Sequence, residues 1–78
     1  MLLYCFDLKS GDLASYNTLK RRFYYHLTKL KKHNFLWNTK SVIVVDGEDE
    51  AEFDLFFSKF RDYLILYKSR VSEMQKIY

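Results

Sequence analysis

Three short runs of this sequence are almost entirely apolar at consecutive positions: residues 2–8, 42–45 and 63–67. Apolar runs of this length, bounded by polar segments, are typical of strands that are covered on both faces. A chain of 78 residues has room for one hydrophobic core, so we expect residues 1–78 to form a single domain. No run approaches the ~20 apolar residues of a membrane-spanning helix, and no membrane segment is expected.

Two segments between these runs carry apolar residues at helical spacing. The first is expected to begin at an N-cap, Ser15 or Asn17, and to continue to about Lys32. Its apolar face consists of Leu19, Phe23, Leu27 and Leu30. The second follows Gly47 and presents Phe53, Phe56, Phe57 and Phe60. Between the two helices, residues 35–37 and 41–45 are predicted to form two strands or one bent strand.

The predicted order of strand, helix, two strands, helix and strand indicates an α+β, ferredoxin-like βαββαβ domain with one antiparallel sheet. Right-handed crossovers place both helices on the same face, so the other face of the apolar strands lacks cover. A bare face of several hundred Å² would forgo on the order of 10 kcal/mol, comparable with the stability of such a domain. We therefore predict a homodimer with sheets packed face to face. Residues 69–78 fit a strand, a helix or a frayed end, and could pack on the partner protomer.

The charges are segregated along the chain. No acidic residue occurs between Leu13 and Val45, whereas an acidic block surrounds Gly47, at Asp46, Glu48, Asp49, Glu50, Glu52 and Asp54. The basic segment alternates with aromatic residues such as Tyr24, Tyr25 and Trp37, which either pack in the protein, the usual role of aromatic residues, or stack on bases. Its cations are either a solvated helix face or a footprint for the phosphates of a nucleic acid. They are Lys20, Arg21, Arg22, Lys29, Lys31, Lys32 and Lys40.

Asp7 is the one acidic residue in the first apolar run. Its place in an apolar strand predicts that Asp7 is buried. Burial of an unpaired carboxylate is costly, so Asp7 is expected to cap the following turn, to form a salt bridge, or to bind a cation. If a two-fold axis brings two Asp7 side chains together, an oxygen-preferring cation or a shared proton would relieve their repulsion. Magnesium or manganese fits such a site and could support phosphodiester hydrolysis.

These residues resemble a known family. The run from Leu3 to Leu8 that contains Asp7, the basic helix, and Thr39-Lys40-Ser41-Val42 at the start of a strand look like CRISPR-associated protein 2 and its relative virulence-associated protein D. The resemblance covers residues 1–70 approximately. It implies a small ferredoxin-like homodimer that binds DNA or RNA, either as a metal-dependent endonuclease of antiviral defence or as a scaffold in spacer acquisition beside an integrase-like companion.

The same resemblance assigns roles to two residues. Asp7 would be the metal ligand and catalytic residue, one from each chain, and Ser41 would lie near the catalytic cleft of the dimer. The alternative from another class is a non-catalytic interaction protein of the same fold that docks on a larger assembly through its acidic block.

The remaining reactive side chains are given structural roles. Cys5 lies in an apolar strand with no neighbour in sequence that would lower its pKa, so it is expected to be a core residue. A lone cysteine forms no intrachain disulfide and no secretory leader is recognisable, which favours a cytoplasmic location. His26 and His33 are expected at the surface beside lysines, with one of them a possible general base.

Overall fold

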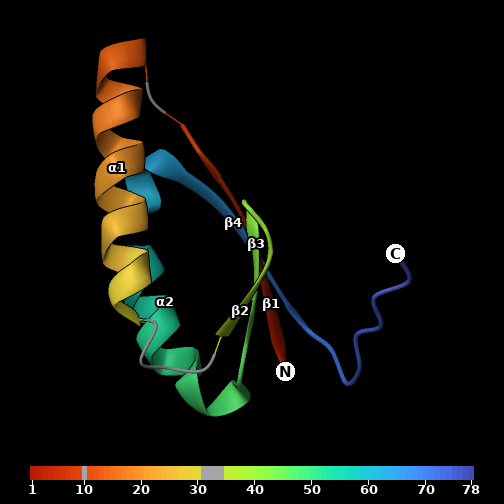
Figure 1. Cartoon of the computed structure of the whole chain (residues 1–78). Coiled ribbons are helices and arrows are strands. Elements are labelled where there is room, and N and C mark those ends of the chain that lie inside the picture. The colour runs from red at the N-terminus through yellow and green to blue at the C-terminus, as the bar shows by residue number, and fades with distance from the viewer. Residues whose placement is uncertain (10, 31–34) are drawn as a thin grey trace.

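The computed structural model describes residues 1–9, 11–30 and 35–78, and only the backbone of residues 35–38. The helices and strands follow the order β1, α1, β2, β3, α2 and β4, as Figure 1 shows. Their bounds are β1 Leu2–Leu8, α1 Leu13–Lys29, β2 Phe35–Thr39, β3 Val42–Val45, α2 Glu50–Ser58 and β4 Leu64–Arg70. Two short 3-10 turns, η2 (Gly47–Asp49) and η3 (Arg61–Tyr63), flank α2. The predicted α+β class is confirmed, and the segment between the helices contains two strands.

The strands form one antiparallel sheet in the order β2-β3-β1-β4. Strand β1 lies inside the sheet, where Leu2 pairs with Val45 of β3 and with Arg70 of β4. Figure 1 shows α1 and α2 on the same side of this sheet. The predicted last strand exists, but Tyr63 belongs to η3 and the strand continues to Arg70. Strand β4 therefore runs beside the whole length of β1.

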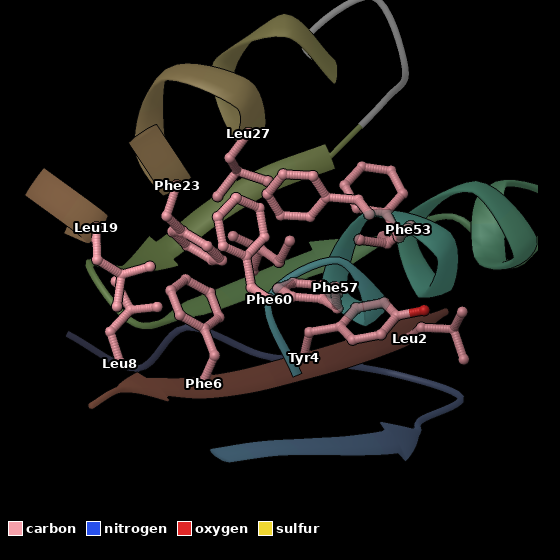
Figure 2. Close-up of a cluster of buried hydrophobic side chains, with 13 residues drawn as sticks. Leu2, Tyr4, Phe6, Leu8, Leu19, Phe23, Leu27, Phe53, Phe57 and Phe60 are labelled. Carbon is pink, nitrogen blue, oxygen red and sulfur yellow. The ribbon is translucent and has the colours of Figure 1, made fainter. Parts of the chain in front are cut away.

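Alternate residues of β1 build the core beneath the helices. Leu2, Tyr4, Phe6 and Leu8 are all buried, because successive side chains of a strand point to opposite faces. Phe23 of α1 is fully buried, and its ring lies 5.1, 5.3 and 5.2 Å from those of Phe6, Phe56 and Phe60 (Figure 2). The predicted apolar faces of both helices are confirmed by the burial of Leu19, Phe23, Leu27, Phe53, Phe56, Phe57 and Phe60.

The N-cap of α1 differs from the prediction. Asp12, not Ser15 or Asn17, precedes the helix, and its Oδ1 accepts a hydrogen bond of 2.8 Å from the Ser15 backbone N–H. The prediction was wrong because the first turn of α1 is exposed, and the apolar spacing therefore does not mark where the helix begins. At the other end, Leu30 is the C-cap, and the expected continuation to Lys32 lies outside the described residues.

The sheet face away from the helices, called the open face below, is apolar and uncovered. By register it comprises Leu3, Cys5 and Asp7 of β1, Val42 and Val44 of β3, and Ile65, Tyr67 and Ser69 of β4. Ile65 is 41% exposed and Tyr67 is 70% exposed, whereas Leu3 and Cys5 are half-buried. The expectation that two helices leave apolar strand residues without cover is confirmed for this part of the sheet.

The C-terminal residues leave the sheet after β4. Val71 exchanges two backbone hydrogen bonds of 3.0 Å with Met1, and residues 71–78 then form neither helix nor strand. In Figure 1 this tail extends away from the two helices, and Ile77 and Tyr78 are exposed. Neither helix in the described part of the chain has the length and hydropathy of a membrane-spanning segment.

Candidate nucleic-acid interface and metal ligand

Asp7 is exposed, and the expectation that it is buried was wrong. It lies on the open face, one residue before the end of β1, and pairs in register with Ile65 of β4. The turn-capping role expected for Asp7 belongs to Asp12. Within the described part of the chain, the Asp7 carboxylate has no hydrogen-bond or ion-pair partner. An exposed carboxylate with no partner fits a role as ligand to a hard cation.

Among residues 1–9, 11–30 and 35–78, no three His, Cys, Asp or Glu side chains cluster in a way that could hold a metal ion. Within the described residues of one chain, Asp7 therefore has no neighbouring His, Cys, Asp or Glu cluster with which it could hold a metal ion. Any site centred on Asp7 needs ligands from a second copy, from a bound phosphate, or from water.

Ser41 lies at the same end of the sheet as Asp7. It precedes β3, and its carbonyl oxygen accepts a hydrogen bond of 2.9 Å from the backbone N–H of Phe6. Phe6 points to the helices and Asp7 to the open face. By the same alternation, the register places Ser41 on the helix side. The structure thus brings Asp7 and Ser41 to one end of the sheet but on opposite faces.

The described cations of α1 are exposed and diverge in direction. Lys20, Arg21, Arg22 and Lys29 form no ion pair among the described residues. Arg22 and His26 line a groove between α1 and α2 together with Glu52 and Lys59. Arg21 and Lys29 lie on the helix face opposite the buried residues. Lys31, Lys32 and His33 lie outside the described residues.

Lys20 and Lys40 lie toward the β2–β3 turn. Tyr24 is four residues from Lys20, and its hydroxyl donates a hydrogen bond of 2.7 Å to the Lys40 carbonyl oxygen. The ring of Tyr24 also contacts Phe6 and Phe23, and burial raises the pKa of its hydroxyl. Tyr24 is therefore held against the core and is not available to stack on a base.

Tyr25 differs from Tyr24 in its exposure. Its side chain is 57% exposed, and the Nζ atom of Lys29 lies 4.5 Å from its ring centroid. Such a cation–π contact restrains both side chains. Of the two adjacent tyrosines predicted as base-stacking residues, only Tyr25 is placed where a base could reach it.

A polar cluster between α2 and β4 was missed by the sequence analysis. The Lys68 ammonium group contacts Glu50 at 2.6 Å and Asp54 at 2.9 Å, and Arg70 contacts Glu50 at 2.6 Å. The hydroxyl of the buried Tyr4 donates a hydrogen bond of 2.7 Å to Asp54. Hydrogen bonds from Arg70 and Lys68 lower the pKa of Glu50, and the bond to Glu50 raises the pKa of Lys68.

This cluster changes how the acidic block is interpreted. Glu50 and Asp54 are spaced by one helical turn, and Lys68 and Arg70 by one strand repeat. This spacing is the sequence signal that could have revealed the cluster. Two of the six acidic residues thus neutralise cations of β4, and they are not free to bind a partner through the docking surface expected of the acidic block.

Comparisons of this chain with protein-family models, with curated proteins and with solved structures found no match.

Proposed function

We propose that this protein binds the phosphate backbone of nucleic acid through α1, as a homodimer of ferredoxin-like subunits. The proposed fold is supported by the order of elements and by the sheet order β2-β3-β1-β4, which suit two split βαβ units. The proposal is independent of any catalytic step.

The observation that carries the proposal is the unequal pairing of charges. The cations of β4 are neutralised by acids of α2, while Lys20, Arg21, Arg22 and Lys29 have no acidic partner in the described part of the chain. Unpaired, exposed cations can contact phosphates without breaking an internal ion pair. Each contact that neutralises a phosphate releases condensed counterions, which drives binding.

The uncovered apolar surface of the open face is the reason for proposing a homodimer. A second copy presents the same apolar surface, so two copies can cover each other around a two-fold axis. Tyr67 and Ile65 would then be removed from water, with a gain of about 25 cal/mol per Å² of apolar area. The tail at 71–78 leaves the sheet beyond β4 and could pack on the partner protomer.

The dimer would also give Asp7 a role. Two Asp7 carboxylates that approach across the axis would repel each other unless a cation or a proton lay between them. Magnesium or manganese would supply Lewis-acid polarisation of a phosphoryl oxygen there. This chain would hold the ion through Asp7. The α1 cations lie on the other side of the sheet from Asp7, so their proposed role is to bind the backbone of a nucleic acid and not to position it at the ion. Ser41 lies at the same end of the sheet as Asp7 but on the opposite face, so no step is assigned to it.

The binding proposal is tested by the salt dependence of affinity. The triple variant Lys20→Gln, Arg21→Gln and Arg22→Gln takes the formal net charge from +3 to 0. A matched control, Lys9→Gln, Arg61→Gln and Lys76→Gln, removes the same charge from exposed positions elsewhere. On labelled duplex DNA, each lost phosphate contact should lower the slope of log K against log salt by about 0.9. Equal slopes for the two variants would reject α1 as the binding element.

The catalytic part is tested separately with short DNA and RNA substrates in magnesium and in manganese. Asp7→Asn keeps the size of the side chain but removes the charge that a cation needs. Cleavage by the wild type that is lost in Asp7→Asn, with unchanged binding in the absence of metal, would support the assignment. Equal cleavage by both proteins would remove Asp7 from the mechanism.

A further inference from the structure

The outer face of α1 carries a basic and aromatic stripe that consists of Arg21, Tyr25 and Lys29. These residues are spaced by four positions, so they lie along one side of the helix and span about 12 Å at 1.5 Å per residue. All three are exposed. They lie opposite Leu19, Phe23 and Leu27, which face the sheet, so the stripe points away from the body of the protein.

Tyr25 is the feature that separates this stripe from an ordinary solvated helix face. Tyr25 is 57% exposed, and Lys29 Nζ lies 4.5 Å from the centroid of its ring. His26 lies edge-on at 5.3 Å between ring centroids. Both contacts restrain the ring, and more than half of the residue still remains in contact with solvent. A restrained and exposed aromatic ring between two cations is a platform on which a nucleobase can stack.

We propose that Arg21, Tyr25 and Lys29 bind single-stranded nucleic acid, with a base stacked on Tyr25 and the flanking phosphates near the two cations. This inference rests on the proposed function and goes beyond it, because it specifies the single strand as the preferred substrate class. A duplex keeps its bases stacked inside, so it offers phosphates to Arg21 and Lys29 but no base to Tyr25.

The test compares Tyr25→Leu with Tyr25→Phe. Leucine has good helix propensity and cannot stack, whereas phenylalanine retains the ring and loses only the hydroxyl. Tyr63→Leu is the matched control, because Tyr63 is 51% exposed and lies in η3, where it borders Thr18 and Arg22 and is not part of the stripe. Circular dichroism melts of all three variants establish that the fold is kept.

Affinities are measured by fluorescence anisotropy for a labelled single strand of mixed sequence and for the duplex that it forms. Tyr25→Leu should weaken single-strand binding roughly 5- to 100-fold, the range of one base–aromatic stack. Duplex binding should stay within about twofold, since phosphate contacts dominate there. Tyr25→Phe and Tyr63→Leu should behave as the wild type. A 2-aminopurine base in the single strand should be quenched by the wild type and not by Tyr25→Leu.

The outcomes separate this inference from the proposed function. If both substrates bind in a salt-dependent way and Tyr25→Leu has no effect, base stacking on Tyr25 is overturned, and the proposed binding of phosphates by α1 stands. Equal losses on single strand and duplex would likewise overturn the stacking role. No binding of either substrate by the wild type would overturn both the proposed function and the stripe.

Discussion

Tyr67→Lys is the substitution that should most clearly separate the two copies of the proposed dimer. Tyr67 is 70% exposed at the centre of β4, and it pairs in register with Cys5 on the open face. Covering about 100–150 Å² of this side chain would contribute about 2.5–4 kcal/mol per chain. Each dimer contains two copies of this residue, so its loss should weaken association by at most about 10⁴- to 10⁶-fold.

The assay is sedimentation velocity over a range of protein concentrations. The wild type should sediment as a dimer at micromolar concentration, and Tyr67→Lys as a monomer throughout. Lysine is well tolerated on an edge strand, so thermal melts should show that the variant monomer is folded. Tyr63→Lys, at a residue of similar exposure in η3, should leave the dimer intact. A folded Tyr67→Lys protein that still sediments as the wild-type dimer would refute the interface.

Three further predictions concern the protomer. Phe23→Ala should lower the free energy of unfolding in urea by about 3–5 kcal/mol, and Phe23→Leu by clearly less. Equal losses in the two variants would show that the Phe23 ring does not fill the centre of the core. Asp12→Ala should lower the free energy of unfolding, obtained from thermal melts, by about 1 kcal/mol because α1 loses its N-cap. An unchanged stability would show that the Asp12 cap does not stabilise α1. Glu50 has a pKa below its ordinary 4.5 because of Arg70 and Lys68. A lowered pKa contributes stability above pH 4.5 that is lost as the pH falls further. Glu50→Gln should flatten this pH dependence, and an unchanged profile would mean that these ion pairs do not persist in solution.

The parts of the fold that were predictable are those set by local sequence patterns. The four phenylalanines of the second helical segment were expected in the core, and all are buried. The strand of residues 2–8 was also expected and has these bounds. The helix follows from apolar residues at a repeat of 3.6, and the strand from a short uninterrupted apolar run that polar residues bound. The start of α1 was not predictable in this way, because its first turn is exposed and a capping residue, Asp12, determines where the helix begins.

The candidate site depends on long-range pairing, and its details could not be predicted. Nothing local to Asp7 shows whether the helices cover its side of β1 or the other, and the apolar run around it suggested burial. The pairing of Glu50 with Lys68 joins residues that are 18 positions apart, and it requires both the register of β4 and the position of α2. For the same reason, the lack of acidic partners for Arg21 and its neighbours became visible only once the acids of α2 had been placed.

The lone cysteine offers the most direct test of the claim that a second copy covers the open face. Cys5 is half-buried there, a free thiol between Val42 and Tyr67 in register. Its rate of alkylation by iodoacetamide should fall as protein concentration rises, in parallel with the change from monomer to dimer mass. Tyr67→Lys should react at the fast, monomeric rate at every concentration. A wild-type thiol that is alkylated equally fast in the monomer and in the dimer would contradict the account.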